Sequence, residues 1–305
     1  MKPLALSLSL LAAPVLAAPP AAPAAPAKAE LEKPAAAVTF KEGLATPESV
    51  LYDAESDTYL VSNINGSPTD KDNNGYIAEL SPEGTVVNAK LIAGGEKGVT
   101  LNAPKGLAMA GGVLYVADLD TVRLFDRKTG AAKGEVKVPG ASFVNDVCAG
   151  PDGKLYVTDS GLTPKFEGSG TDALYVLEPG KKPKLKALLK SKDLPHPNGV
   201  AATRDTLYVS FFGAAELRTF DLKGKPKGEP TKLPAGGGDG VVLLGEDVLV
   251  SSWDGKAVYR GRPGGEFTAL LSGLTAPADL GFDSKRSRVL VPRFQDNLVE
   301  AFDVK

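Results

Sequence analysis

A short apolar strand that ends in valine returns six times along this chain, and its spacing limits the fold more than any other feature. The six valines are Val61, Val116, Val157, Val209, Val250 and Val291. Successive copies stand roughly 40 to 55 residues apart. A period near 40 residues with several short strands in each unit is typical of the blades of a β-propeller.

The fourth repeat shows most clearly how each unit divides into strands. Four predicted strands, at residues 199–203, 206–210, 216–222 and 229–233, are separated by turn residues such as the pair Lys223-Gly224. Helical periodicity is absent from the rest of the mature chain. The sequence therefore predicts an all-β protein.

The last repeat ends the chain at its third strand, which leaves one blade without an outer strand. The segment 37–41 precedes the first inner strand and belongs to no repeat of its own. We expect this N-terminal strand to complete the last blade, since closure removes exposed sheet edges. The prediction is a six-bladed β-propeller over residues 37–305.

The N-terminus has the features of an export signal. Lys2 precedes an apolar run at residues 4–13, and small residues follow that suit cleavage. That run is shorter than the ~20 residues that a membrane span needs. We expect a signal peptide at 1–18, an Ala/Pro-rich linker at 19–36, and a periplasmic or secreted protein without a lipid-anchor cysteine.

The charge and the cysteine content limit which molecules the protein can bind and how its fold is stabilised. The net charge of −2 makes nucleic acid an unfavourable partner. With Cys148 as the single cysteine, an intramolecular disulfide is impossible, so stability must come from the closed core. We expect a monomer with no membrane span that acts on a small molecule.

Oxygen-bearing side chains recur at one phase of the repeat, about a dozen residues before the valine. They are Glu48, Asn145, Asn198 and Asp239. Equivalent positions in a propeller face one another around the axis, so these side chains should converge. Hard oxygen donors without Cys or His favour Ca²⁺, or another divalent cation of that kind, over Zn²⁺.

Aromatic residues gather on the same predicted face. Those that precede or follow the relevant strands are Phe143, Phe166, Phe211, Phe212, Trp253 and Phe294. The two long insertions, 65–75 and 161–172, should overhang that face. Part of the aromatic set will pack between blades. The rest, with Phe143, Phe211 and Trp253 as the candidates for substrate contact, would line a small-molecule pocket.

Four motifs in order carry a resemblance to a known family. They are Pro47-Glu48-Ser49, Asn145-Asp146, Asn198-Gly199 and Asp239-Gly240. With them the chain resembles, over about residues 37–305, the senescence marker protein, gluconolactonase and luciferin-regenerating-enzyme-like family of six-bladed propellers. Paraoxonases and strictosidine synthase share this architecture with different chemistry, so the fold alone does not decide the function.

The resemblance implies a role for each ligand position. Glu48, Asn198 and Asp239 would hold one divalent metal, often calcium, and Asn145 would contact water on the metal or the substrate. Asp239 would also be the catalytic general base. Because a carboxylate bound to a cation has a lowered pKa, Asp146 and Asp279 remain alternatives for the base.

Two positions depart from the pattern of relatives. Sugar-lactonase members have an arginine where this chain has Phe143, which argues against a sugar lactone. Paraoxonases use a pair of histidines, and this chain has only His196. His196 should lie near the mouth of the channel, where it could contact the substrate or shuttle a proton.

Lys105 occupies the equivalent position of the second repeat. It could anchor a substrate carboxylate, or it could exclude a second metal. Two hypotheses remain for the whole protein. One is a calcium-dependent lactonase or esterase, and the other is a non-catalytic propeller that binds a small ligand or a partner protein.

Overall fold

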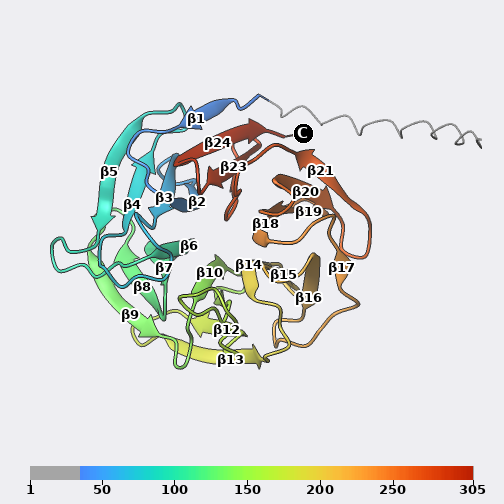
Figure 1. The fold of residues 1–305 in the computed structure, drawn as a ribbon. Coiled ribbons are helices and arrows are strands. Elements are labelled where there is room, and N and C mark those ends of the chain that lie inside the picture. Colours follow the sequence, from blue (N-terminus) through green and yellow to red (C-terminus); the bar gives the residue numbers. More distant parts are fainter. Residues whose placement is uncertain (1–34, 305) are drawn as a thin grey trace, which may run out of the picture. The chain divides into compact units, whose positions relative to one another are not determined.

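The computed structural model describes residues 35–304, which form strands, turns and loops without a helix. Six four-stranded sheets stand around a central axis, each a blade with one strand near the axis and one at the rim (Figure 1). The six-bladed, all-β prediction is confirmed. The predicted signal peptide (1–18) and all but the end of the linker (19–36) lie outside the described residues.

The blades follow one another in chain order. Blade 1 contains β2 (Pro47–Asp53), β3 (Thr58–Asn63), β4 (Tyr76–Leu80) and β5 (Val86–Ala93). Blade 2 contains β6 (Pro104–Ala110), β7 (Val113–Asp118), β8 (Thr121–Asp126) and β9 (Ala132–Lys137). Blade 3 contains β10 (Val144–Ala149), β11 (Leu155–Asp159), β12 (Ala173–Glu178) and β13 (Lys184–Lys190).

The second half repeats this order. Blade 4 contains β14 (Pro197–Ala202), β15 (Leu207–Phe211), β16 (Glu216–Phe220) and β17 (Thr231–Lys232). Blade 5 contains β18 (Gly238–Leu244), β19 (Asp247–Ser252), β20 (Ala257–Gly261) and β21 (Phe267–Leu271). Blade 6 contains β22 (Gly281–Asp283), β23 (Arg288–Arg293), β24 (Leu298–Asp303) and, from the other end of the chain, β1 (Val38–Phe40).

The ring closes as the sequence predicts, because β1 pairs antiparallel with β24 as the outer strand of blade 6. Val38 lies opposite Ala301, and Phe40 lies opposite Val299. Phe40 is buried and contacts the Tyr59 ring of blade 1 edge to face, with ring centroids 5.7 Å apart. The closing strand therefore joins the last blade to the first.

The hydrophobic core is divided among the junctions between neighbouring blades. Tyr115 of blade 2, for example, packs in one cluster with Val157 of blade 3, and Leu217 of blade 4 packs with Val250 of blade 5. A cluster of this kind lies at each of the six junctions. Since each junction needs both of its blades, the ring is expected to unfold as a unit.

Several of the outer strands are short or carry exposed charged residues. In β13 every lysine is exposed, and β17 has only two residues. Lysine on an edge strand opposes pairing with another chain. Within residues 35–304, the structure contains no helix that is long and apolar enough to cross a membrane.

Two N-terminal truncations test the closure. Removing residues 1–35 keeps β1 and should leave the melting temperature nearly unchanged. Removing residues 1–41 deletes the strand with Phe40, whose burial alone contributes about 2 kcal/mol, and exposes the edge of β24. The melting temperature, measured by circular dichroism, should then fall by several degrees at least. Equal melting temperatures for the two truncations would contradict closure by β1.

Candidate functional site

The inner strands share a bulge at the position that carries the predicted ligands. In β2 the pairing register shifts between Pro47 and Ser49, on either side of Glu48. A similar shift occurs in β6, β10, β14 and β18, around Lys105, Asn145, Asn198 and Asp239. A bulge leaves a residue outside the ladder and re-aims its side chain. Five such irregularities thus bring five polar side chains to the central cavity, the four predicted oxygen donors and Lys105.

Hydroxyl groups on the second strands hold these bulges and were not predicted. Thr158 Oγ1 accepts a hydrogen bond from Asp146 N (3.0 Å) and donates one to the carbonyl oxygen of Asn198 in the next blade (2.6 Å). Ser251 Oγ accepts from Gly240 N and donates to Ala278 O, both at 2.8 Å. The hydroxyl therefore ties one ligand strand to its neighbour.

The repeat contains a signal that could have identified these hydroxyls. The residue directly after each repeat valine is Ser62, Ala117, Thr158, Ser210, Ser251 or Pro292. The hydroxyl-bearing units are the four that supply Glu48, Asn145, Asn198 and Asp239. Blades 2 and 6, which lack the hydroxyl, lack an oxygen ligand as well.

A cavity of about 170 Å³ lies where the bulged side chains meet. Its walls are Glu48, Ile64, Pro68, Lys105, Phe143, Asn145, Leu162, Phe166, Asn198, Phe212, Asp239, Trp253 and Phe294. All four predicted ligands, Lys105, Phe143 and Trp253 are brought together here. Pro68, Leu162 and Phe166 come from the two insertions, which therefore overhang this opening.

Glu48 and Asp239 are the two acidic groups of the cavity, and each has a buried oxygen without a hydrogen-bond partner. These atoms are Glu48 Oε2 and Asp239 Oδ1. The other Asp239 oxygen, Oδ2, accepts from the Trp253 indole at 2.8 Å. Burial raises the pKa of Glu48 well above its usual range, with the Asp239 charge adding to it. Burial likewise raises the pKa of Asp239 to about 7.

The donor set suits a hard cation. Asn145 Nδ2 donates to Ser160 Oγ (2.9 Å), while the amide oxygen of Asn145 accepts from no described residue. Among residues 35–304, no three acidic, histidine or cysteine side chains gather as a metal cluster. A metal here would therefore need the amide oxygens of Asn145 and Asn198 beside Glu48 and Asp239. Unpartnered buried carboxylate oxygens are unfavourable unless a cation or proton joins them, so the residues fit a divalent ion.

Aromatic rings enclose the cavity on two sides. Phe143 faces Phe166, with ring centroids 6.3 Å apart. On the other side, Trp253 lies between Phe212 (5.6 Å) and Phe294 (5.2 Å). Such walls favour an apolar ring or chain, and the polar groups at the axis would orient it.

Phe211, predicted to contact substrate, does not line this cavity. It is fully buried in the core between blades 3 and 4, where the Arg218 guanidinium lies over its ring at 4.8 Å. Successive side chains in a strand point to opposite faces, and β15 ends at Phe211. Phe212 therefore takes the place in the wall.

His196 also lies outside the cavity wall. Its Nδ1 is 2.8 Å from the Ser160 carbonyl oxygen and 3.0 Å from Asp172 Oδ1. Asp172 Oδ1 in addition accepts the His196 backbone N–H at 3.1 Å. These contacts fix the loop before β14.

Asp146 and Asp279, the alternative bases, follow the ligand positions along the inner strands and lie further along the central axis. Together they line a separate cavity of about 440 Å³ at the far end of the inner strands. Asp146 Oδ2 accepts from Val200 N (2.7 Å), and Asp279 Oδ2 accepts from Ser49 Oγ (2.5 Å). Burial raises the pKa of Asp146 to about 6 and that of Asp279 well above its usual range. Their oxygens join neighbouring blades, which leaves Asp239 as the base candidate in the aromatic cavity.

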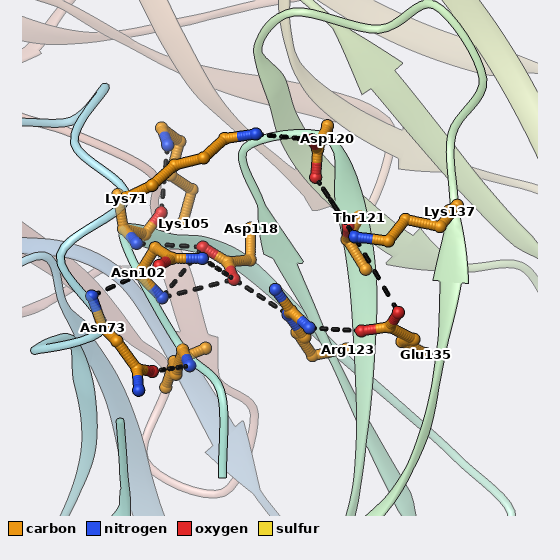
Figure 2. Close-up of polar contacts among 12 residues, drawn as sticks. Lys71, Asn73, Asn102, Lys105, Asp118, Asp120, Thr121, Arg123, Glu135 and Lys137 are labelled. Carbon is orange, nitrogen blue, oxygen red and sulfur yellow. Dashed lines mark hydrogen bonds and ion pairs between the residues drawn. The ribbon is translucent and has the colours of Figure 1, made fainter. Parts of the chain in front are cut away.

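Lys105 is the single basic side chain of the cavity wall, and it is 1% exposed. Its Nζ donates to the Ala103 carbonyl oxygen at 3.0 Å and lies 4.4 Å from the centroid of the Phe143 ring. Burial lowers the pKa of Lys105 to about 8, while the charges of Glu48 and Asp118 oppose that shift. Figure 2 shows this lysine beside the charged cluster of blade 2.

Among the solved structures that are similar to this chain are two propellers. A gluconolactonase from Xanthomonas campestris has a TM-score of 0.64 and 20% identity, over 86% of this chain and 87% of that one. Streptogramin B lyase has a TM-score of 0.58 and 11% identity, over 87% and 96%. No protein-family model and no curated relative matches the sequence. At these identities the likeness shows the fold alone. The six-bladed propeller of this chain is similar to the fold of a gluconolactonase structure, as the sequence resemblance led us to expect.

Proposed function

We propose that this protein is a divalent-metal-dependent hydrolase of lactones or esters that acts in the aromatic-walled cavity. The observation that carries the proposal is the pair of buried, unpartnered oxygens, Glu48 Oε2 and Asp239 Oδ1, of two residues that line that cavity. Two buried carboxylate oxygens without partners in one cavity are unfavourable in a scaffold that binds no ligand. The likeness to a gluconolactonase supports the same class of reaction.

Glu48, Asn198 and Asp239 would hold the ion, with Asn145 close by, and Ca²⁺ is the ion that such oxygens prefer. When bound, the ion would supply charge that polarises a carbonyl oxygen. The second-strand hydroxyls keep the backbone under these side chains fixed, so the donor set is organised before a ligand arrives.

Asp239 is the proposed general base. The Trp253 indole holds Oδ2 at 2.8 Å, so Oδ1 is the oxygen that would face both the ion and a water in the cavity. A pKa near 7 without metal is suited to proton transfer at neutral pH, and a bound cation would lower it. The hydrolytic activity should therefore extend below pH 7 when the ion is present.

The walls of the cavity indicate the substrate. Phe143, Phe166 and the group around Trp253 offer apolar surface, which favours ligand surface at about 25 cal/mol per Å² buried. A sugar hydroxyl buried against the same wall without a partner costs about 1–3 kcal/mol. Acyl-chain lactones and aryl esters should therefore be preferred over gluconolactone.

The Phe143→Arg variant tests this preference. Arginine offers donors for hydroxyl groups and removes apolar wall, so the ratio of kcat/KM for gluconolactone to that for an aryl ester should rise about tenfold or more. Steady-state rates on both substrates measure the ratio, with Phe211→Leu as a control for aromatic loss outside the cavity. If wild type hydrolyses gluconolactone faster than every apolar substrate, the argument from the aromatic walls is wrong.

We also propose that the protein works as an exported monomer, in the periplasm or outside the cell. The export rests on residues 1–18 alone, and fractionation of the producing cells tests it. A panel of lactones and aryl esters assayed with Ca²⁺ and with chelator separates the hydrolase from the non-catalytic propeller. The latter would bind such compounds without turnover.

A further inference from the structure

We propose that Lys105 forms an anion subsite inside the aromatic cavity, so that the substrate is a ring-bearing lactone or ester with a carboxylate group. This inference rests on the proposed function for the reaction, but the binding that it predicts can be measured without turnover.

The ammonium group of Lys105 lacks a close counter-charge. No carboxylate oxygen of the described residues lies within 4.0 Å of Nζ, and its single hydrogen-bond acceptor is Ala103 O at 3.0 Å. Since an ammonium has three N–H donors, two are left for a ligand. Lys105 is 1% exposed, so bulk water does not serve them freely. A lysine that only filled space would not keep its donors beside an open cavity.

The position of Lys105 is fixed by a polar network in blade 2 (Figure 2). Asp118 Oδ1 accepts from the Ala103 backbone N–H at 2.9 Å, which holds the residue whose carbonyl binds Lys105. Asp118 Oδ2 accepts from Arg123 Nε at 2.9 Å, and Arg123 also pairs with Glu135. Arg123 thus shares the Asp118 charge, and Asp118 makes no close ion pair with Lys105.

Glu48 is the remaining acidic neighbour of Lys105 in the cavity. In the proposed complex Glu48 is a ligand of the divalent ion. The Lys105 ammonium would therefore lie near a second positive charge in the same buried cavity. Glu48 would then share its charge between the ion and Lys105, which leaves Lys105 only partly compensated in a site of low dielectric. A ligand carboxylate next to Nζ would supply the missing counter-charge.

The dimensions of the cavity limit the ligand. Its volume of about 170 Å³ is close to the ~150 Å³ that accommodates benzene in an apolar protein cavity. The Phe143 ring, with Lys105 Nζ 4.4 Å from its centroid, joins the apolar wall to the cation. One aromatic ring with a carboxylate on its edge meets both surfaces at once.

Trp253, the only tryptophan of the chain, lies in the cavity wall and reports on binding by its fluorescence. Benzoate and its neutral analogue benzamide are titrated into the calcium-loaded protein. We expect benzoate to bind about tenfold or more tightly than benzamide, because a charge-assisted hydrogen bond is worth about 1.5–3 kcal/mol. Equal affinity of the two compounds overturns the inference, whatever any variant does.

Variants then assign the preference to Lys105. Lys105→Met should remove the preference for benzoate, and Lys105→Arg should keep part of it. Lys165→Met, at an exposed position of the overhanging loop, is the matched control and should leave the preference unchanged. If Lys105→Met binds benzoate as tightly as wild type, the anion is held by the metal alone, and the inference is wrong.

An activity assay separates this inference from the proposed function. For wild type, kcat/KM for 4-carboxyphenyl acetate should exceed that for phenyl acetate, and Lys105→Met should lose that difference. If neither ester nor any lactone is hydrolysed while benzoate binds through Lys105, the hydrolase proposal fails and the anion subsite stands. If esters are hydrolysed without a Lys105-dependent preference, the hydrolase stands and the subsite fails.

Discussion

Replacing Asp239 with asparagine is expected to lower kcat/KM for the best lactone or aryl ester by about 10²–10⁴-fold, the range for loss of a general base. Asparagine keeps the size of the side chain and can still accept from the Trp253 indole, which now donates to Asp239 Oδ2. What it lacks is the carboxylate oxygen that takes a proton. Steady-state kinetics at saturating Ca²⁺ measure the effect separately from weaker metal binding.

Asp205→Asn is the matched control for that variant. Asp205 is an exposed acidic residue in the turn before β15, where it pairs with Lys227. An exposed ion pair contributes little, so its loss should leave the rate unchanged. Should Asp239→Asn retain the wild-type rate, Asp239 is not the base, and another group must take the proton.

The second large effect concerns the stability of Glu48→Gln relative to wild type, which should differ in sign between the metal-free and the calcium-loaded protein. Burial raises the pKa of Glu48 well above its usual range, so in the metal-free protein its ionisation opposes folding. That cost is absent below the ordinary pKa of a glutamate and grows as the pH rises above it. Glutamine carries no charge, so the metal-free variant should be more stable than metal-free wild type at pH 8.

With Ca²⁺ the order should reverse. An ion at 100 times its Kd stabilises the folded state by about 2.7 kcal/mol, which raises Tm by roughly 5–10 °C in a domain of this size. Glu48→Gln removes a charged ligand and should lose most of this gain. Thermal unfolding at pH 8, with Ca²⁺ and with chelator, gives the four Tm values. An equal Ca²⁺-induced shift in both proteins would exclude Glu48 as a ligand.

Most of the fold was predictable because the blade is a local unit that the chain repeats. Strands such as Leu155–Asp159 bury nearly every side chain, and turn residues separate them, so their phase is visible in the sequence. The closing strand was predictable from counting, since one blade lacked a partner for Leu298–Asp303. Both predictions use the alternation of apolar strands and turn residues, which depends only on residues close together in the sequence.

The features that were missed depend on contacts between blades. The start of β14 at Pro197, where residue 199 was predicted, follows from the bulge, and hydrogen bonds to the neighbouring blade maintain that bulge. Phe211 and Phe212 are adjacent and chemically identical, so only the parity of β15 decides which one faces the cavity. His196 is close to Asn198 in sequence, but Ser160 and Asp172 hold it aside.

One titration tests the central claim, that the ion held at Glu48 and Asp239 is required for hydrolysis. Protein stripped with chelator is mixed with increasing Ca²⁺, and the rate on the best apolar lactone or aryl ester is followed. The account predicts no hydrolysis before Ca²⁺ is added and a rise that saturates at one ion per chain. Hydrolysis at full rate in the stripped protein, or none at any Ca²⁺ concentration, would contradict it.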